Sequence, residues 1–422
     1  MLAVDEDRVI ADLRALAEFG KAGTGVNRPA LSEADFSARQ WLSRQMQAAG
    51  LEATIDGIST VYGRSPAAQS ILVGSHSDSV PRGGWLDGAL GVIFALEVAR
   101  ASCASESPIG VDVISFADEE GTWLACLGSR AFCGELTVSR LAGLQSKSGE
   151  RLFDRLQQLG LSGRPLARLD PQRHRAYLEA HIEQGPRLEA ERIDVGIVTA
   201  IVGMRRHLVR FAGRADHAGT TPMAMRSDAA MAMFRFATSL ADAFGAAGGV
   251  DAVWNFGVVT VRPGAGNVVP AEAELMVEFR NSSPVLLDRM EAAFHTAVRA
   301  ADGAYGVPVS STPNVSLKGA AMNPDLVGTF VAAADEMGVS HVRMPSGAGH
   351  DAMILASYIP AAMLFVPSIG GRSHDISENT NEADIRRGFR VFAAGAAKTI
   401  ERLSRAGGGA AAVSARQKER TS

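Results

Sequence analysis

The stretch SILVGSHSDSVPRGGWLDGALG, residues 70–91, decides the fold that the sequence predicts. An apolar run leads to His76 and Asp78, a glycine-rich loop follows up to Asp87, and residues 89–100 have the pattern of a helix. A strand, a loop carrying imidazole and carboxylates, and a helix are typical of ligands at the carboxyl edge of an α/β sheet. Taken alone, the stretch fits equally well a metal site at His76 and Asp87, or a buried histidine and a helix-capping aspartate.

The composition is that of an ordinary globular protein. The chain has 422 residues, 46% of them hydrophobic and 21% charged, which favours two domains. A net charge of −4 without a basic stripe argues against nucleic acid as a partner. We expect no membrane association, since no apolar run approaches the roughly 20 residues of a membrane span. The acidic N-terminus lacks the features of a secretory signal.

The cysteines predict a reducing compartment. Three of them, an odd and sparse set, argue against a disulfide framework and for a cytoplasmic protein. Cys126 and Cys133 also lack the paired spacing of a thiolate zinc site. Any metal must therefore use nitrogen and oxygen ligands.

The order of the expected elements changes near residue 200. Before it, helices at 5–19, 33–49 and 135–160 accompany apolar strands, as in an α/β domain. After it, the order β-α-β-β-α-β is that of the ferredoxin-like motif. We therefore predict a discontinuous α/β domain, an inserted α+β domain and a disordered tail, at residues 1–199 with 316–406, 200–315 and 407–422, respectively.

Four apolar runs are followed by groups that can bind metal. These groups are His76 with Asp87 in the loop beyond, the pair Glu119-Glu120, His181 and His374. In a parallel sheet the four strand ends would lie along one edge. Two imidazoles, two carboxylates and a bridging carboxylate are what a site for two metal ions about 3.5–4 Å apart needs.

The adjacent pair Glu119-Glu120 suggests a division of roles. If one carboxylate binds metal, the other lies beside the metal-bound water and can accept its proton. A metal ion lowers the pKa of such a water toward ~7, so a glutamate is a sufficient base. Alone, the pair would read as a solvated acidic turn.

The motifs together resemble a known family, the M20-type metallohydrolases. More narrowly, the chain is similar to the hydantoinase/carbamoylase amidases, which include N-carbamoyl-L-amino acid hydrolases, β-ureidopropionases and allantoate amidohydrolases. The similarity covers about residues 8–405, and its motifs, in order, are GSHSDSV, WLDG, ADEEG, HIEQGP, AGRADHAGTTPMAMRSDA, SGAGHDA and a late SH. HIEQGP is typical of this branch, because peptidases and aminoacylases of the superfamily usually have a carboxylate where this chain has His181.

The resemblance implies a metallopeptidase-like catalytic domain, an inserted dimerisation domain and two divalent metal ions per subunit. His76, Asp87 and His181 would hold one ion, and Asp87, Glu120 and His374 the other. Glu119 would be the general base, and Asp78 would orient His76. Mixed imidazole and carboxylate ligation suits Zn, Mn, Co and Ni alike.

The resemblance also implies substrate contacts. His217 would stabilise the oxyanion in the partner subunit of a homodimer, Asn267 and Arg280 would bind the substrate carboxylate, and Gln184 would contact the carbamoyl end. Gly349 and His350 would support the pocket. Each of the first three also has a plain structural explanation: His217 could brace its turn, Asn267 could supply turn geometry, and Arg280 could form a surface ion pair.

The expected reaction is hydrolysis of the C–N bond of a small anionic N-carbamoyl acid, giving an amino acid, CO2 and ammonia. The alternatives are an N-acyl-amino-acid hydrolase, meaning an aminoacylase or dipeptidase, and a catalytically inactive binding protein. Departures from the family motifs bear on the substrate: Ser77 and Ser79 in the first motif, SHDISENT without a proline in the last, and Trp123. We expect these to alter the pocket wall, with Trp123 favouring a larger or more apolar substrate side chain.

Overall fold

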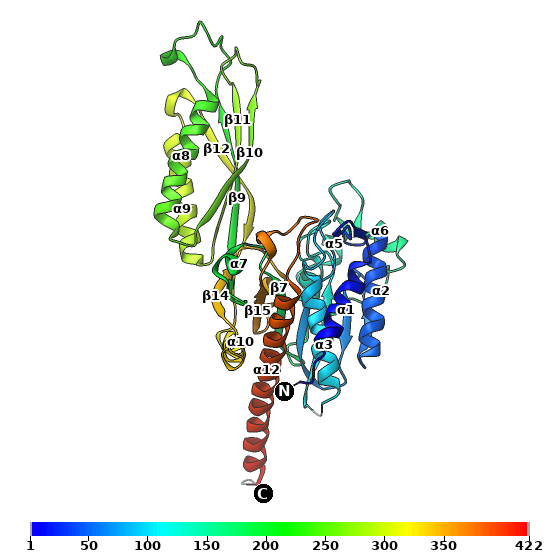
Figure 1. Ribbon diagram of the computed structural model, residues 1–422. Coiled ribbons are helices and arrows are strands. Elements are labelled where there is room, and N and C mark those ends of the chain that lie inside the picture. Colours follow the sequence, from blue (N-terminus) through cyan, green and yellow to red (C-terminus); the bar gives the residue numbers. More distant parts are fainter. Residues whose placement is uncertain (1, 106, 420–422) are drawn as a thin grey trace. The chain divides into compact units, whose positions relative to one another are not determined.

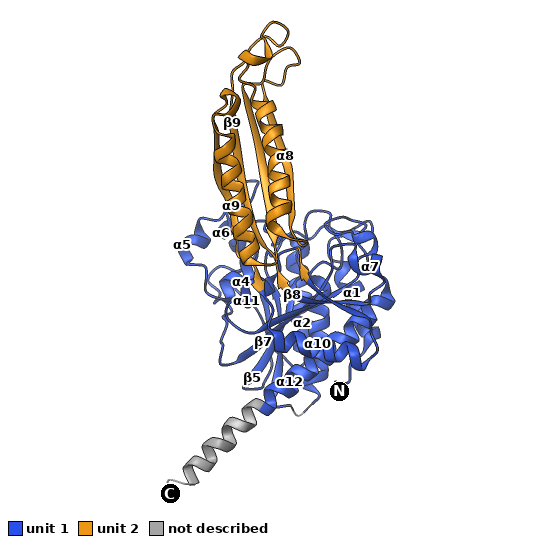
Figure 2. Cartoon of the chain, turned by 90° about the vertical axis from the view of Figure 1, so that its left-hand side faces the viewer, with its two compact units in different colours: residues 1–199, 321–344, 348–422 blue, residues 200–320, 345–347 orange. Residues whose placement is uncertain are grey.

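The computed structural model describes residues 2–105 and 107–419, with side chains up to residue 405 (Figure 1). The tail predicted to be disordered, residues 407–422, lies outside the part whose side chains are described. The chain divides into two compact units (Figure 2): unit 1 comprises residues 1–199, 321–344 and 348–422, and unit 2 comprises residues 200–320 and 345–347. The boundary expected at residue 315 falls inside a strand, because that strand continues to Leu317.

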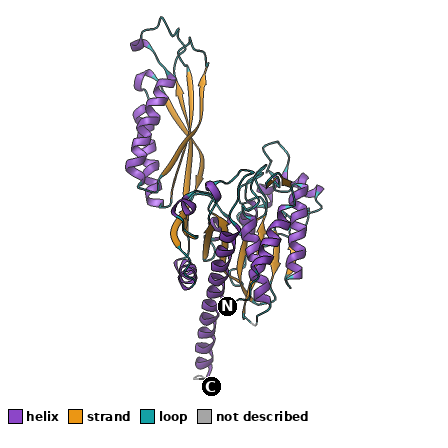
Figure 3. Ribbon diagram, in the orientation of Figure 1, coloured by secondary structure: helices purple, strands orange, loops and turns teal. Residues whose placement is uncertain are grey.

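Unit 1 is built on a mixed sheet (Figure 3). Within the described residues its strand order is β13-β8-β15-β7-β5-β6-β4-β3, and β14 also pairs with β8. The strands are β3 (Glu52–Ile55), β4 (Val61–Arg64), β5 (Gln69–His76), β6 (Ile109–Phe116), β7 (His174–Ile182), β8 (Val195–Ile201), β13 (Ala320–Ala321), β14 (His341–Ser346) and β15 (Ala361–Val366).

The centre of this sheet is parallel. β15 pairs with β7, β7 with β5, and β5 with β6, all in the same direction, whereas the flanking pairs β15–β8 and β6–β4 are antiparallel. β6 and β15 are buried along their whole length. Continuous apolar strands of this kind need cover on both faces of the sheet. Their carboxyl ends lie at a single edge, as the sequence predicts.

One helix of unit 1, α3 (Ala89–Cys103), packs closely against the central strands. It is almost entirely buried, and Gly91 lets it approach β7 closely, since a Cβ there would lie 2.2 Å from the carbonyl oxygen of Ala180. The others are α1 (Glu6–Ala17), α2 (Glu33–Ala48), α4 (Leu127–Phe132), α5 (Val138–Ala142), α6 (Leu152–Gln158), α7 (Arg187–Glu191), α10 (Pro324–Glu336), α11 (Asp351–Leu355), α12 (Glu382–Glu419) and the 3-10 turn η3 (Ile369–Gly371); a short ladder pairs β1 (Lys21–Ala22) with β2 (Gly25–Val26). None of the described helices is long and apolar enough to cross a bilayer.

The single helix expected at 135–160 is wrong. Two short helices, α5 and α6, occupy this region, joined by a turn that includes Gly149 at a φ of 86°. This backbone conformation is not helical, and glycine adopts it without a steric penalty. The apolar periodicity comes from leucines of both helices, which pack into one core cluster.

Unit 2 has the ferredoxin-like fold that its element order predicts. Its antiparallel sheet has the order β10-β11-β9-β12 among the described residues. Helices α8 and α9 begin at side-chain caps, Asp228 and Ser283, and cover the sheet with phenylalanine-rich faces. The elements are β9 (Gly203–Ala212), η1 (Met223–Met225), α8 (Ala229–Gly248), β10 (Val253–Arg262), β11 (Glu272–Asn281), α9 (Pro284–Ala301), η2 (Ala304–Gly306) and β12 (Val309–Leu317).

Candidate metal centre

Three neighbouring parallel strands supply most of the candidate ligands. His76 is the last residue of β5, His181 is the second-last residue of β7, and Glu119-Glu120 follow β6 by three residues. Because β7, β5 and β6 are adjacent and parallel, these side chains reach the same edge of the sheet.

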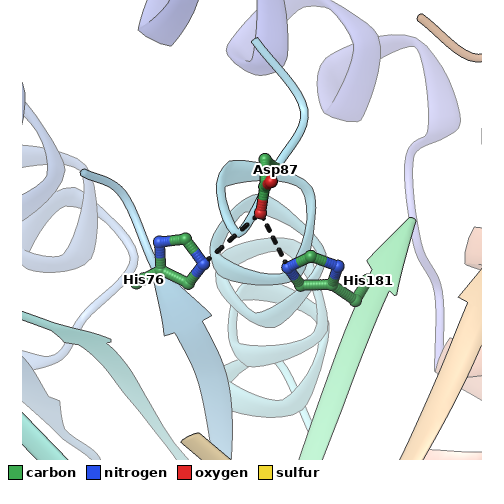
Figure 4. A group of neighbouring side chains, drawn as sticks. All are labelled: His76, Asp87 and His181. Atoms are coloured by element: carbon green, nitrogen blue, oxygen red, sulfur yellow. Dashed lines mark ion pairs between the residues drawn. The ribbon is translucent and has the colours of Figure 1, made fainter. Parts of the chain in front are cut away.

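Asp87 enters this edge from the loop that precedes α3. The backbone turns at Gly88, which has a φ of 65° and is the N-cap of α3. A Cβ at this position would lie 2.4 Å from Nε2 of His76, so only glycine fits. The turn places the carboxylate of Asp87 between the imidazoles of His76 and His181 (Figure 4).

We call His76, Asp87 and His181 the first ligand group. Oδ1 of Asp87 lies 3.1 Å from Nε2 of His181 and 3.6 Å from Nε2 of His76. Nδ1 of His76 lies 3.1 Å from the carbonyl oxygen of Asp78, and Nδ1 of His181 lies 3.0 Å from that of Ile182. Each Nδ1–H thus donates to a main-chain carbonyl, which leaves the lone pair of each ring on Nε2. In His181 this nitrogen accepts from the N–H of Gly88 at 3.1 Å.

Asp87, Glu120 and His374 form the second ligand group. Nε2 of His374 lies 3.5 Å from Oδ2 of Asp87 and 3.4 Å from Oε2 of Glu120. The two oxygens of Asp87 therefore face different imidazoles, as a carboxylate that bridges two metal ions must. In this second group the side chain of His374 is 52% exposed, whereas the side chains of the first group are buried.

His374 does not follow a strand directly. β15 ends at Val366, and the turn η3 intervenes before His374, which has a φ of 56°. The expectation that its imidazole stands at a strand end is therefore wrong, although the loop still returns it to the same edge of the sheet. A positive φ is costly for a residue with a side chain and is often found at functional sites.

The donor atoms fit divalent metal ions. In each group one imidazole nitrogen or carboxylate oxygen per residue lies within 4.8 Å of the others. Mixed nitrogen and oxygen donors suit Zn, Mn, Co and Ni. The carboxylate of Asp87 is buried, and an ionised carboxylate is unfavourable there unless positive charge compensates it.

The pKa shifts of the buried groups also indicate that the site requires positive charge. Burial raises the pKa of Glu119 well above its ordinary value, and burial together with Asp87 raises the pKa of Glu120 to about 8. For His76 burial acts to lower the pKa, but the contact with Asp87 and the charge of Glu119 raise it well above the usual range. Without metal, protons neutralise the cluster, so metal binding must displace them.

Glu119 lies beside the first group. Its Oε2 is 3.7 Å from Nε2 of His76, and the thiol of Cys126 donates to its Oε1 at 3.6 Å. Asp118, just before it, has a φ of 54° and accepts hydrogen bonds from the backbone N–H groups of Thr122, Trp123 and Leu124. This turn orients Glu119 and Glu120 toward different parts of the cluster, as separate roles for them require.

Asp78 reaches His76 through its main chain. Its carboxylate accepts from Nη2 of the buried Arg39 at 3.0 Å and from the N–H of Glu120 at 3.3 Å. Its Oδ1 is 4.0 Å from Nδ1 of His76, farther than its own carbonyl oxygen. Asp78 therefore joins the ends of β5 and β6, and it is the carbonyl group that orients the imidazole.

Gln184 contacts the bridging carboxylate. Nε2 donates to Oδ2 of Asp87 at 2.9 Å and to Oγ of Ser373 at 3.1 Å. Oε1 of Gln184 is buried, and no group of the described residues donates to it. A buried acceptor without a donor is costly, and at a site of this kind it indicates a bound ligand.

His350 lies next to the first ligand group. The ring of His350 is buried, with its centroid 4.5 Å from that of His181, and burial lowers its pKa well below the usual range. His350 is therefore neutral, and Gly349 before it is exposed. Their predicted part in substrate binding stays a prediction.

His217, Asn267 and Arg280 belong to unit 2. Nδ1 of His217 accepts from the N–H groups of Gly219 and Thr220, and the chain at His217 pairs with Val268, next to Asn267. Arg280 donates to the carboxylate of Glu278 and, at 2.6 Å, to the carbonyl oxygen of Gly347. Both structural explanations given above thus hold for His217 and Arg280, and their substrate roles stay predictions.

Trp123 and Ser77 do not have the surroundings we expected. Trp123 packs in the core cluster with Leu127 and Leu152, and its indole N–H donates to the carbonyl oxygen of Glu150. Ser77 is buried, and its Oγ accepts from Ser115. Neither residue supports an argument about the size of the substrate, because each is occupied within the scaffold.

Two site residues escaped the sequence analysis. Oγ of Ser373 lies 3.0 Å from Oδ2 of Asp87, and the buried Glu378 accepts from the N–H of Asp87 at 3.1 Å. Both lie in the segment SHDISENT, residues 373–380. The sequence signal that could have indicated Glu378 is an acidic residue four positions after the candidate ligand His374. Alone, this signal is weak.

Comparisons with known proteins decide the family. The model of the peptidase family M20/M25/M40 matches residues 72–398, most of the chain. This chain belongs to that family. By its membership it is a hydrolase of amide C–N bonds, and the predicted resemblance and the metallopeptidase-like α/β fold are confirmed. That the inserted domain forms a dimer stays a prediction.

Individual relatives place the chain more narrowly. It is 35% identical over 408 residues to an N-carbamoyl-L-amino-acid amidohydrolase of Paenarthrobacter aurescens, covering 91% of this chain and 96% of the relative. It is 32% identical to the allantoate amidohydrolase of Escherichia coli K12, covering 90% and 94%. A crystal structure of a hydantoinase/carbamoylase family amidase from Burkholderia phymatum is 43% identical, with a TM-score of 0.90 over 96% of this chain and 99% of that one. The chain is therefore a member of the hydantoinase/carbamoylase branch.

Proposed function

We propose that the chain is a dinuclear-metal amidohydrolase that cleaves the C–N bond of an N-carbamoyl amino acid or a related small ureido acid. The observation that carries the proposal is the position of Asp87, whose two oxygens face the first and the second ligand group, with Glu119 beside His76 of the first. The relatives that act on carbamoyl amino acids and allantoate support a ureido substrate.

Glu119 has the position of the general base. When bound, two divalent ions would polarise the ureido carbonyl and lower the pKa of a water molecule. Glu119 would accept a proton from that water and return it to the leaving nitrogen. Water adds to the carbonyl carbon and the C–N bond to the amino acid breaks, which gives the amino acid and carbamic acid. Carbamic acid then decomposes to CO2 and ammonia.

Gln184 favours a carbamoyl over an acyl substrate. Its buried Oε1 has no donor among the described residues, while Nε2 is held by Asp87 and Ser373. The NH2 of a carbamoyl group can donate to this oxygen, whereas the methyl of an N-acetyl group cannot. An acceptor left buried without a donor costs about 1–3 kcal/mol, enough to discriminate between the two substrates.

The residues proposed for the substrate carboxylate and oxyanion cannot all serve the same site from a single subunit. Arg280 pairs with Met204 at one end of the β9–β11 ladder, and Glu272 pairs with Ala212 at the other end, beyond which lie His217 and Asn267. The eight residue steps from Glu272 to Arg280 span roughly 25 Å of strand. A small substrate that meets both Arg280 and His217 therefore needs two chains, which supports a homodimer with shared sites.

One assay tests the reaction. Chelator-treated protein is reloaded with Zn, Mn, Co or Ni and incubated with N-carbamoyl, N-acetyl and N-succinyl amino acids, allantoate and ureidoglycolate. We expect ammonia release from ureido compounds and loss of activity in Glu119→Gln. Release of the amino acid from the acyl compounds alone would identify an aminoacylase, and no hydrolysis with any metal would overturn the proposal.

Mixing two inactive variants tests the shared site. His217→Ala lacks the group proposed to act across the dimer, and Glu119→Gln lacks the base. If the sites are shared, a mixed dimer keeps one intact site, so part of the activity returns on mixing. No recovery, with mixed dimers shown to form, would refute the shared site.

The proposal includes the cellular location of the protein and the metals that it binds. Cys103, Cys126 and Cys133 are free thiols. This supports a cytoplasmic protein, in which thiols stay reduced. Zn, Mn, Co and Ni all suit the ligands, so the assay above includes each of them.

A further inference from the structure

The carboxylate of Glu378 lies behind the bridging Asp87. The side chain is buried, and Oε1 accepts from the backbone N–H groups of Leu86, at 3.3 Å, and Asp87, at 3.1 Å. Gly84 makes room for this carboxylate, because a Cβ there would lie 1.8 Å from Oε1 of Glu378. Gly84 and Glu378, nearly 300 residues apart in sequence, thus pack directly against each other.

The other oxygen of Glu378 engages the loop that carries His374. Oε2 lies 3.0 Å from Oγ of Ser373, the residue just before His374. The same hydroxyl is 3.0 Å from Oδ2 of Asp87 and accepts from Nε2 of Gln184. Ser373 has one proton to donate and two carboxylates to receive it, so Ser373 lies between Glu378 and the bridging carboxylate.

Further contacts bind the same two loops together. Nε1 of Trp85 donates to Oδ1 of Asn379 at 3.3 Å. Trp85 is next to Leu86 in sequence, and Asn379 is next to Glu378, so this hydrogen bond joins the same two loops. His374 itself has a positive φ and a half-exposed side chain, and its imidazole faces the carboxylates of Asp87 and Glu120. Its position must therefore be set by the loop around it rather than by burial of its ring.

We propose that Glu378 is a positioning residue that, directly and through Ser373, fixes the loop of Asp87 against the loop of His374 and so creates the second metal site. Glu378 itself binds no metal ion. One of its oxygens accepts from the main chain of Asp87, and the other accepts from Ser373, the residue next to His374. This inference rests on the two-metal centre of the proposed function and adds the group that assembles its exposed half.

Metal binding, measured directly, tests the inference without relying on turnover. The full-length chain is stripped with chelator and titrated with Co²⁺ or Mn²⁺ by calorimetry, and bound metal is counted by elemental analysis. Glu378→Ala should keep the first ion and bind the second about 10- to 100-fold more weakly, the usual cost of losing a group that orients ligands. Ser373→Ala should show a smaller loss at the same ion.

Glu378→Gln is the conservative variant. Its amide oxygen can still accept from Leu86 and Asp87, and its NH2 can donate to Oγ of Ser373. We therefore expect second-ion affinity within a few-fold of the wild type. Glu97→Gln is the control, because Glu97 is also a buried carboxylate of unit 1 but pairs with Arg8. It should bind both ions as the wild type does.

The outcomes separate this inference from the proposed function. If the wild type binds fewer than two ions, the proposed two-metal function fails first. If the wild type binds two ions and Glu378→Ala binds both with unchanged affinity, the role of Glu378 is refuted. Should Glu378→Ala fail to fold by circular dichroism, Glu378→Asp takes its place, since its carboxylate is one methylene too short for both loops. Wild-type affinity in Glu378→Asp would also refute the role.

Discussion

The two ligand groups share Asp87 but are built in different ways. The first group takes its histidines from the ends of adjacent buried strands, and its imidazoles are oriented by main-chain carbonyls. The second group takes Glu120 from a turn after β6 and His374 from a loop beyond η3, with half of the imidazole exposed. The sheet therefore prepares one metal position by itself, whereas loop contacts must prepare the other. We expect the first group to bind its ion more tightly.

The largest effect should come from the residue that the groups share. Asp87→Asn keeps the size of the side chain but removes the charge that faces both groups. We expect loss of the second ion, weak binding of the first and a fall in activity of at least roughly 10³-fold. Elemental analysis and ammonia release measure both effects.

The exposed Asp335 offers a matched control for this change. Asp335→Asn should leave metal content and rate unchanged. Two firmly bound ions in Asp87→Asn would show that the groups do not depend on a shared carboxylate.

Removing one imidazole from each group compares them directly. His181→Ala should abolish high-affinity metal binding, because it removes one of the two imidazoles of the first ligand group, the group that the sheet holds in place. His374→Ala should leave one tightly bound ion and lower activity by about 10²-fold, the order expected for a misplaced metal ligand. Calorimetric titration of both variants with the same ion gives the comparison. Equal losses in the two variants would contradict the difference between strand-built and loop-built positions.

Packing of α3 against β7 should tune the first group. In Gly91→Ala the new methyl group would meet the carbonyl oxygen of Ala180, next to His181. The start of α3 must shift, and Asp87 with it, so we expect affinity for the first ion to fall by roughly 10-fold.

Gly328 in α10 is the control, because a Cβ there meets nothing within 4 Å. Gly328→Ala should leave affinity unchanged and raise stability by about 0.5–1 kcal/mol. Unchanged metal affinity in Gly91→Ala would mean that the helix does not set the distance between Asp87 and His181.

The smallest effect concerns the scaffold away from both groups. Burial raises the pKa of Asp56 to about 6, although its carboxylate accepts from three backbone N–H groups. Between its ordinary pKa of 3.8 and 6 the unfolded chain is ionised while the folded chain keeps the proton. The free energy of unfolding therefore falls as pH rises through this window, by up to about 1.4 kcal/mol per pH unit, and the effect ends above 6.

Asp56→Asn removes the ionisable group and with it this contribution to the pH dependence of the free energy of unfolding. Denaturant unfolding in chelator, from pH 4 to 7, should show a shallower decline for the variant than for the wild type, whatever the absolute cost of the substitution. Parallel curves would assign the acid dependence to other groups, including those of the metal centre.

The sequence predicted what strand order alone determines. His76, Glu120 and His181 could be grouped because carboxyl ends of parallel strands meet at one edge. Contacts between distant loops could not be predicted, since nothing local in SHDISENT shows that Glu378 receives the N–H groups of Leu86 and Asp87. Trp123 was misjudged for the same reason: a motif position does not reveal whether a side chain lines a pocket or completes a core.

The orientation of His76 and His181 by main-chain carbonyls has an evolutionary consequence. A substitution can delete a side-chain partner, but none can delete the carbonyl oxygen of residue 78 or 182. The tautomer of each imidazole is thus insulated from mutation at neighbouring positions. Descendants of such a protein can exchange residues around the ligands, and so explore new substrates, while inheriting the strand-built half of the metal centre unchanged.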